Sequence, residues 1–280
     1  MAGKLYIVST PIGNLGDMTM RGVEVLSQVA YIAAEDTRRT LALLNSLNIR
    51  GRLISCHEHS GAARVEEIVR LMEHGADVAL CTDAGTPIIS DPGAPLTALA
   101  AKRGIEIVSV PGACAAIAAL TVSAIPAEKF VFEGFLPRDK TRKQALQNAC
   151  AHPYTTVLYE SPHQLSRTLS ELAEICPKRQ IALCKELTKL HESVRRGSVA
   201  QMAAHYQSQE QPRGEYVLVL AGAPREVHKE PSEEEIAERI REYIEKGMKK
   251  KDAVKTAAQQ LCVNKNKAYD ILLRLVLEKG

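Results

Sequence analysis

The stretch VALCTDAGTPIISDPG, from Val78 to Gly93, decides the fold. It begins as an apolar strand, passes Asp83 and then breaks into a long loop of small and rigid residues, among them Gly85, Pro87 and Pro92. A plain turn needs only two or three such residues. A buried strand that ends in an acid and a loop of this kind predicts a backbone that lies close to a ligand.

Four further runs of the same kind surround this strand within the first 123 residues. They are LYIVS (5–9), YIAAE (31–35), RLISC (52–56) and IEIVSV (105–110). Runs that are apolar on both faces suit strands covered on both sides. Between them lie helical patterns, such as ARVEEIVRLMEHG with a stop signal at Gly75. Strands that alternate with helices predict a mainly parallel α/β sheet.

A second α/β unit is predicted from Ala124 onward. Its strands are KFVFEGF, TTVLYES, IALCKE and GEYVLVLAG, with an amphipathic helix at HQLSRTLSELAEI, and we expect antiparallel pairing after Lys189. A polar linker, PREVHKEPSEEE, leads to three short helices in 232–280, with Asn264 as a predicted N-cap of a helix-turn-helix break. The predicted domains are 1–123 and 124–225, both α/β, and 226–280, the linker and helical tail.

Composition narrows the classes of function. The chain has 280 residues, 45% hydrophobic and 25% charged, which suggests two or three globular domains. It has no Trp and three Phe, which disfavours aromatic platforms for stacking bases. The net charge of +3 permits a nucleic-acid partner without requiring one.

Cysteine usage and the lack of a leader predict a cytoplasmic protein. The seven cysteines (56, 81, 114, 150, 176, 184 and 262) are widely spaced and form no CxxC pair, which is typical of reduced, mostly buried thiols. No charged-then-apolar leader and no apolar run near 20 residues is present, so we expect neither export nor a membrane span.

Three unusual loops follow strands of the first unit, where ligands of open α/β sheets collect. They are TPIGNLGD (10–17), DAGTPIISDPG (83–93) and PGACAAIAAL (111–120). A dinucleotide site is the alternative, since Glu35 and Asp36 end the second strand. The spacing GNLG does not match the glycine signature of such a site, however, and no phosphate-binding GxxxxGK[ST] loop occurs. A ligand held mainly by its pyrophosphate is therefore disfavoured.

Two further polar segments are candidate sites. CHEH (56–59) has residues that could bind zinc, but no second cluster completes a tetrahedral site, so we predict no metal and interpret it as a polar loop facing a substrate. YESPHQL (159–165) and KELTKLHESVRRG (185–197) are charged loops at strand ends of the second unit. Lys185 and Glu186 directly continue the apolar run IALC, which predicts ionisable groups at the mouth of a sheet.

These motifs together resemble the tetrapyrrole methylase superfamily, and within it the branch that acts on ribosomal RNA. The likeness covers residues 4–222 and rests on TPIGNLGD, AEDTRRT, HEH, TDAGTPIISDPG, VPGACAA, EGFLPR, YESPHQL, KELTK and GEYVLVLAG, in this order. It implies two α/β domains with S-adenosylmethionine in the cleft between them, and a homodimer. It also implies 2′-O-methylation of the ribose of cytidine 1402 in the decoding centre of 16S ribosomal RNA.

The resemblance also implies a donor site. The donor carries a sulfonium cation, a zwitterionic amino acid and an apolar adenine, so it needs close backbone contacts and one well-placed carboxylate, here Asp83. The other implied contacts are Pro11, Gly13, Ala84, Gly85, Thr86, Pro87, Ile88, Cys114, Ala115, Tyr159, Glu160, Leu187, Ala221 and Gly222. Cys114 and Ala115 stand where relatives often have Ser or Thr, so a hydroxyl contact is missing there.

The acceptor side is less defined by the sequence. A ribose hydroxyl is a weak nucleophile, and a general base would help; the candidates are Lys185, Glu186 and Asp36. Phosphates would be bound by basic residues of the second strand-end loop and of the tail: Arg38, Lys249, Lys250, Lys251, Lys265 and Lys267. Two rival functions remain open at this stage, a methylase of a small tetrapyrrole and a non-enzymatic RNA-binding module.

Overall fold

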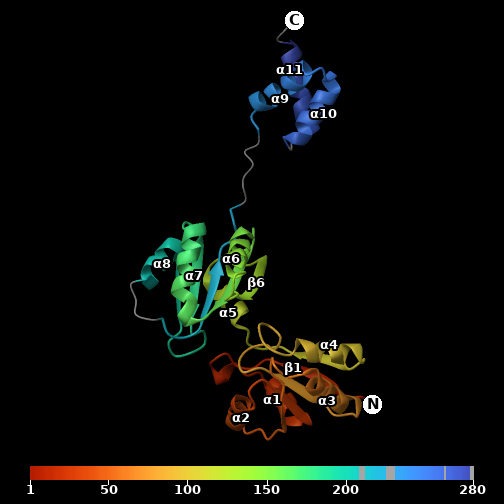
Figure 1. The fold of residues 1–280 in the computed structure, drawn as a ribbon, viewed down its shortest axis with the longest axis vertical. Helices are drawn as coiled ribbons and strands as arrows, with labels where there is room; N and C mark the ends of the chain where they lie inside the picture. The colour runs from red at the N-terminus through yellow and green to blue at the C-terminus, as the bar shows by residue number, and fades with distance from the viewer. Residues whose placement is uncertain (208–211, 225–230, 262, 278–280) are drawn as a thin grey trace. The chain divides into compact units, whose positions relative to one another are not determined.

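The computed structural model describes residues 1–207, 212–224, 231–261 and 263–277; residues 275–277 are described by their backbone alone. The chain divides into two compact units, Met1–Ala223 and Pro224–Gly280. The first unit contains two five-stranded sheets, and the second contains three helices (Figure 1). The α/β class and the helical tail predicted from the sequence are therefore confirmed.

The first sheet is parallel throughout, in the order β3-β2-β4-β1-β5. Its strands match the five apolar runs: β1 Lys4–Val8, β2 Tyr31–Ala34, β3 Leu53–Ser55, β4 Val78–Cys81 and β5 Glu106–Val110. All four residues of β4 are buried, as its uninterrupted apolar run predicts. Parallel strands end at the same edge, so the loops after β1, β4 and β5 lie together.

Helices cover both faces of this sheet (Figure 1). One face packs against α1 (Met20–Gln28) and α2 (Thr37–Ser46), the other against α3 (Ala62–Glu73) and α4 (Ala94–Lys102). The short helix η1 (Leu15–Asp17) lies in the loop between β1 and α1. The two apolar layers explain why strands of this sheet carry no polar alternation.

The second sheet is mixed, in the order β6-β7-β10-β8-β9. Its strands are β6 Phe130–Phe135, β7 Thr155–Glu160, β8 Gln180–Lys185, β9 Ser193–Ser198 and β10 Tyr216–Leu220. β10 is antiparallel to both of its neighbours, and β9 is antiparallel to β8, which confirms the antiparallel pairing expected after Lys189. The interpretation of residues 193–197 as a loop was wrong: they belong to the edge strand β9, whose charged residues face solvent on an exposed edge.

This sheet is covered by α5 (Ala115–Ser123) on one face and by three helices on the other. These are α6 (Arg142–Ala151), α7 (Pro162–Ile175) and α8 (Val199–Gln207). α5 follows β5 in the chain but packs against β7, β8 and β10, so it joins the two halves of the first unit. α5 ends at Ser123, where the sequence predicts a boundary between two domains. That boundary stays a prediction.

The second unit is a bundle of α9 (Glu233–Glu245), α10 (Lys250–Gln260) and α11 (Lys265–Leu277) with its own apolar core. A capping box between Ser232 and Glu235 begins α9. Asn264 accepts a bond from the N–H of Asn266 (2.8 Å), which confirms the predicted cap of α11. Most of the predicted linker (225–230) and Cys262 lie outside the described residues. The six cysteines that the structure describes are free thiols, five of them buried. No described helix is long and apolar enough to cross a membrane.

Candidate functional site

Hydrogen bonds join the three loops at the carboxyl edge of the first sheet. Thr10 and Gly85 form an isolated antiparallel bridge, with N–O distances of 2.8 and 3.0 Å. The Thr86 hydroxyl donates to the Ala113 carbonyl (3.0 Å) and lies 2.9 Å from the Ser9 hydroxyl. The loops after β1, β4 and β5 therefore form one connected surface, as their shared edge predicts.

Gly85 shows why this surface requires a glycine. Its φ of +88° lies in the left-handed region, and a Cβ there would lie 3.4 Å from Ile12. Both neighbouring loops thus approach its backbone closely. The space would admit a Cβ, but a residue with a Cβ is strained at this φ, so glycine lets the loop keep the conformation that pairs with Thr10.

A cavity of about 360 Å³, the main cavity, lies between these loops and the second sheet. This volume is within the range of small-molecule sites. Its walls are formed by residues of both sheets and their loops: Ile12, Glu35, Arg39, Asp83, Ala84, Gly85, Thr86, Ile89, Ser90, Asp91, Cys114, Ala115, Phe135, Tyr159, Glu160, Ser161, Pro162, Cys184, Leu187, Glu215, Tyr216 and Val217.

The charge of the main cavity is negative. The described lining residues include five carboxylates and the guanidinium of Arg39. Three of the carboxylates have a cationic partner, Asp83 with Arg39, Glu160 with Arg142 and Glu215 with Lys189, whereas Glu35 and Asp91 form no ion pair among the described residues. Burial, with Glu35 and Asp83 nearby, raises the pKa of Asp91 to about 6. A cavity of this kind attracts a cationic or proton-donating ligand.

Asp83 is held at the edge of the main cavity by two donors from the start of α2. Its Oδ1 accepts from the N–H of Asp36 (3.1 Å), and its Oδ2 lies 3.1 Å from Nη1 of Arg39. Burial, the largest effect, raises the pKa of Asp83, and the carboxylates of Glu35 and Asp36 add to it. The carboxylate is thus oriented but only partly compensated.

The wall from the second sheet is built around Tyr159. Its hydroxyl accepts from the N–H of Ala116 (3.1 Å) at the start of α5, and burial raises its pKa. The rings of Phe132 and Phe135 contact it edge-on, with centroids 4.9 and 5.5 Å away. An apolar aromatic wall therefore faces the acidic loops, an arrangement suited to a planar heterocycle.

Backbone strain concentrates in the two loops that flank the main cavity. Ile88 and Ser90 in the β4–α4 loop have φ of 77° and 66°, and Glu186 and Thr188 after β8 have φ of 51° and 67°. These values are unfavourable for residues with a Cβ, most of all for β-branched ones. Such strain is common at ligand sites, where surrounding contacts hold the chain in place.

Most predicted donor contacts lie in the main cavity, and some do not. Those in its lining are Asp83, Ala84, Gly85, Thr86, Cys114, Ala115, Tyr159, Glu160 and Leu187. Pro11, Gly13, Pro87 and Ile88 are in the same loops but do not line it. At Gly13 the space is occupied by Lys189, whose Cγ would lie 2.4 Å from an added Cβ.

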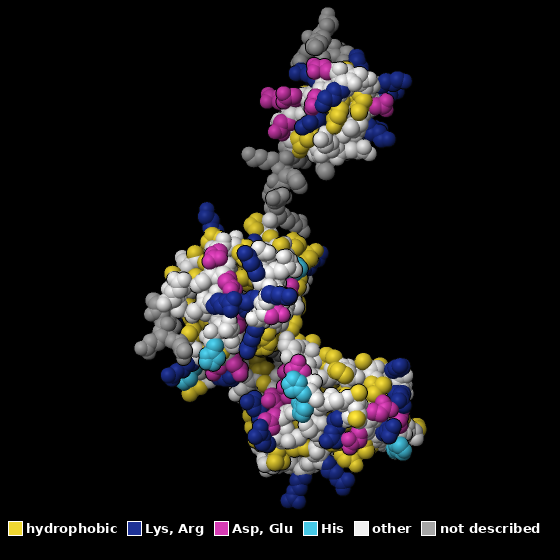
Figure 2. Space-filling view, viewed as in Figure 1, with side chains coloured by type: hydrophobic (Ala, Val, Ile, Leu, Met, Phe, Trp, Pro, Cys, Tyr) yellow, Lys and Arg dark blue, Asp and Glu magenta, His cyan; other side chains and the backbone are white. Residues whose placement is uncertain are grey.

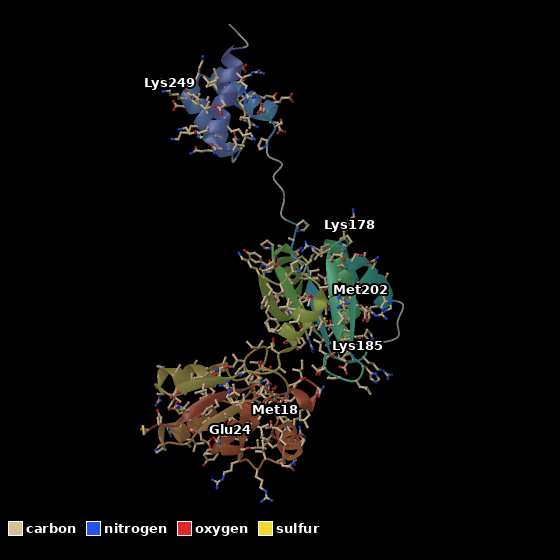
Figure 3. All side chains as sticks on the ribbon, turned by 180° about the vertical axis from the view of Figure 1, so that it is seen from behind. Met18, Glu24, Lys178, Lys185, Met202 and Lys249 are labelled. Atoms are coloured by element: carbon tan, nitrogen blue, oxygen red, sulfur yellow. The ribbon has the colours of Figure 1, made fainter. Side chains whose placement is uncertain are left out.

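Ala221 and Gly222 lie at the other edge of the second sheet. The N–H of Ala221 donates to the carbonyl of Gln180, at the start of β8, whereas Tyr216 pairs with Lys185 at its end. Figure 3 labels Lys178, just before the start of β8, and Lys185, its last residue, which mark these two ends. Because β10 is antiparallel, its first residues, Glu215 to Val217, line the main cavity instead.

The three predicted bases are engaged elsewhere and do not line the main cavity. The Lys185 ammonium lies 6.0 Å from the Tyr216 ring centroid. Glu186 pairs with Lys189 (2.9 Å) and accepts from the N–H of Glu215; although burial acts to raise its pKa, these partners lower it overall. Hydrogen bonds from Arg38 lower the pKa of Asp36 to about 2.

The CHEH segment forms a loop after β3. Cys56 is buried, and the N–H of His57 donates to the Ser60 hydroxyl (2.9 Å). Among the described residues no group of three or more His, Cys, Asp or Glu side chains could hold a metal ion. Cys56, His57 and Glu58 line a second cavity of about 390 Å³, as the interpretation of a polar loop facing a substrate requires.

Several lining residues could not be selected from the sequence. They are Glu35, Arg39, Ser90, Asp91, Phe135, Glu215, Tyr216 and Val217. Glu35 and Arg39 flank the predicted Asp36 and Arg38, and Asp91 stands within the quoted loop. The signal available was the density of acids at strand ends, which does not tell which of two neighbours points inward.

The predicted phosphate-binding residues lie in both units. The Arg38 side chain is 88% exposed and pairs with Asp36 (2.8 Å). Lys249, Lys250 and Lys251 are exposed at the start of α10, and Lys265 and Lys267 are at the start of α11. Figure 2 shows basic and acidic side chains side by side on the visible face of the helical unit.

Comparison with known proteins identifies a family for the first unit. Residues 4–203, which lie in that unit, match the family described as Tetrapyrrole (Corrin/Porphyrin) Methylases. A protein of Synechocystis sp. named "Ribosomal RNA small subunit methyltransferase I" is 42% identical over 98% of both chains. Proteins of the same name from Bacillus subtilis and Escherichia coli O157:H7 are 41% and 39% identical, over 96% and 97% of this chain and 93% and 95% of theirs.

Solved structures share the fold of the first unit. The uroporphyrin-III-C-methyltransferase of Thermus thermophilus superposes with a TM-score of 0.53 at 24% identity, over 78% of this chain and 94% of that one. A cobalt precorrin-4 methyltransferase gives a TM-score of 0.55 at 18% identity, with the same coverage. At such identities the likeness concerns the fold alone.

Proposed function

The chain belongs to the tetrapyrrole methylase family, and on this premise we propose that it transfers a methyl group from S-adenosylmethionine to the ribose 2′-hydroxyl of a decoding-centre cytidine in 16S ribosomal RNA. The curated relatives that match nearly the whole chain, helical tail included, are named for the small ribosomal subunit. We place this reaction in the cytoplasm and expect the chain to act as a homodimer.

The acidic main cavity is the observation that supports this donor. S-adenosylmethionine supplies a methyl group on a sulfonium cation. The two lining carboxylates that form no ion pair among the described residues, Glu35 and Asp91, favour a cation, and the product, whose sulfur is neutral, loses that attraction. The Tyr159 wall offers an apolar surface for adenine, and the β4–α4 loop offers backbone groups for the polar end.

Two measurements test this proposal. Calorimetry should show S-adenosylmethionine binding, which a non-enzymatic RNA-binding module lacks. Methyl transfer from labelled donor should reach purified, undermodified small subunits. Binding of the donor with transfer only to a small tetrapyrrole would favour the rival from the same family.

The basic residues at the starts of α10 and α11 support RNA binding by the helical unit. Lys249, Lys250 and Lys251 lie at the positive end of the α10 dipole, where cations are unfavourable unless an anion compensates. Phosphates of RNA would provide that anion. We therefore propose that the surface formed by Lys249, Lys250 and Lys251 binds ribosomal RNA and not the donor.

We expect substitution of Lys249, Lys250 and Lys251 by Gln, or deletion of residues 224–280, to weaken subunit binding and leave donor affinity unchanged. Each phosphate contact releases counterions, so the triple variant should lower the slope of log affinity against log salt by about 2. Filter binding across a salt series measures the slope, and calorimetry measures donor affinity. An unchanged slope in both variants would show that this surface contacts no RNA.

Lys185 and Glu186 are better suited to holding the substrate than to proton transfer, because Glu186 is ion-paired and its pKa is lowered. We expect Glu186→Ala to reduce subunit affinity while the single-turnover rate changes by less than the 10² to 10⁴-fold that is typical of a lost general base. Rapid-quench measurement at saturating subunit separates the two effects. A loss of 10²-fold or more at saturation would restore Glu186 as the base.

A further inference from the structure

The main cavity and the second cavity share part of their walls. Three residues line both: Glu35 at the end of β2, and Ser90 and Asp91 in the β4–α4 loop. The second cavity is otherwise formed by the loop after β3 and the start of α4. At about 390 Å³ it is as large as the main cavity, at about 360 Å³. A donor in one space and an acceptor in the other would meet at Glu35, Ser90 and Asp91.

We propose that the second cavity receives the target nucleotide and that the Asp91 carboxylate, at the junction, takes the proton from its ribose 2′-hydroxyl. This inference rests on the proposed function and deepens it by naming the acceptor site and the base. In the balanced step, the 2′-oxygen forms a bond to the methyl carbon, the bond from that carbon to sulfur breaks with its electrons left on sulfur, and the hydroxyl proton moves to Asp91.

The lining of the second cavity suits a nucleotide. Pro92, Ala94 and Pro95 provide apolar surface for the faces of a base. His57 and Ser60 provide polar groups at its rim. Transfer also requires the acceptor oxygen to be about 3 Å from the methyl carbon and in line with its bond to sulfur. A nucleotide in the second cavity can satisfy this requirement where the two spaces meet.

Two carboxylates occupy the junction, and their contacts differ. Glu35 accepts a hydrogen bond from the Thr82 hydroxyl (2.8 Å), and the N–H of Asp83 lies 3.5 Å from the same oxygen. The Thr82 hydroxyl also contacts Asp91, but its single proton is donated to Glu35 in the 2.8 Å bond. Glu35 is thus bound to the end of β4, and Asp91 is the carboxylate that remains more available to an incoming hydroxyl.

The electrostatic surroundings of Asp91 also suit a base. Burial, Glu35 and Asp83 raise its pKa to about 6, and a hydrogen bond with Thr82 acts in the opposite direction. Tyr159, on β7, also interacts with Asp91, and His57 and Glu58 line the second cavity with it. A carboxylate that is mostly ionised at neutral pH, yet more basic than an ordinary one, fits general-base catalysis.

The backbone holds Asp91 in place. Ser90, with φ of 66°, packs against β6: a Cβ on Gly134 would lie 2.8 Å from the Ser90 hydroxyl. On the other side, Gly93 has φ of 128°, and an added Cβ would lie 2.6 Å from Leu80. Asp91 is thus fixed between a contact with the second sheet and the start of α4.

The test is a pH series of single-turnover methyl transfer, with labelled S-adenosylmethionine and undermodified small subunits, both saturating. In the wild type the rate should rise with pH and level off above an apparent pKa near 6, because the base must be ionised. Asp91→Asn should lower the rate by about 10² to 10⁴-fold and abolish this rise. Asp91→Glu, which keeps a carboxylate, should retain the rise at a reduced rate.

Glu35→Gln is the discriminating variant. Removal of the negative charge next to Asp91 should lower the pKa of Asp91, so the rise should move to lower pH. Glu24→Gln, an exposed acid on α1 (Figure 3), serves as the matched control and should leave the profile unchanged. Calorimetry should show that Asp91→Asn weakens donor binding by less than tenfold, because Asp91 is one of several acids in the main cavity, so the rate at saturating donor reports on proton transfer.

Each other outcome overturns the inference. A rate within threefold of wild type in Asp91→Asn, or a rise abolished by Glu35→Gln instead, would remove Asp91 from proton transfer. A loss of donor affinity of tenfold or more in a folded Asp91→Asn would make the residue a donor contact rather than the base. A wild-type chain that binds no donor or methylates no subunit would overturn the proposed function itself, which is distinguishable from failure of the Asp91 assignment alone.

Discussion

Replacement of Asp83 by alanine is expected to weaken S-adenosylmethionine binding by at least tenfold, or about 1.4 kcal/mol. The carboxylate is held at the main cavity by the N–H of Asp36 and by Arg39, and burial raises its pKa because its charge is only partly compensated. A cationic or proton-donating group of the donor would complete that compensation. Calorimetry with the folded variant measures the effect.

The matched control for this prediction is Asp17→Ala. Asp17 is an exposed acid in η1, in the loop after β1, and does not line the main cavity. The Asp17→Ala substitution removes the same charge from the same edge of the sheet. Because Asp17 does not line the main cavity, the substitution should leave donor affinity nearly unchanged. Equal affinities of wild type, Asp83→Ala and Asp17→Ala would exclude Asp83 from the donor site.

Arg142→Met is expected to destabilise the chain by about 3 to 5 kcal/mol, the usual result of leaving a buried charge without its partner. The Arg142 side chain is 4% exposed and that of Glu160 5%. The guanidinium donates to the Thr168 hydroxyl (2.6 Å), which in turn donates to Glu160, and it pairs with Glu171 (3.0 Å). Without it, the Glu160 carboxylate remains buried with only neutral donors.

Two further variants separate this effect from a simple loss of packing. Glu160→Gln combined with Arg142→Met removes both charges and should recover much of the stability. Arg167→Met breaks an ion pair with the same Glu171, but the Arg167 side chain is 58% exposed, so the loss should be about 1 kcal/mol or less. Urea unfolding followed by circular dichroism gives the three free energies. Similar losses in Arg142→Met and Arg167→Met would contradict the role of burial.

The sequence predicts the first sheet well because its strands lie between two layers of helices and consist of mostly apolar runs, and because the loops after β1, β4 and β5 carry Gly and Pro residues. β9 is different: its six residues, SVRRGS, include two arginines and only one large apolar side chain and lie on an edge of the sheet, so no apolar period marks them. They form a strand because β8 offers them a complete antiparallel ladder. Such pairing depends on a neighbour far from any local pattern.

The candidate site was predictable to the extent that loops define it. The β4–α4 loop and its Asp83 follow directly from a buried strand, and the family resemblance adds Tyr159 and Glu160. The sequence predicts antiparallel pairing after Lys189 but not which end of β10 faces the ligand, and β10 contributes Tyr216 rather than Ala221 to the main cavity. Likewise Asp91 reads in sequence as part of a turn, and only the meeting of two cavities distinguishes it.

The central claim is tested most directly by mapping the methyl group on the RNA. Undermodified small subunits are incubated with the chain and labelled S-adenosylmethionine, and the 16S ribosomal RNA is then digested and analysed by mass spectrometry. The account predicts one labelled nucleoside, a 2′-O-methylated cytidine from the decoding centre. Label on a base, label on the ribose of another nucleoside, or no label in the presence of bound donor would contradict it.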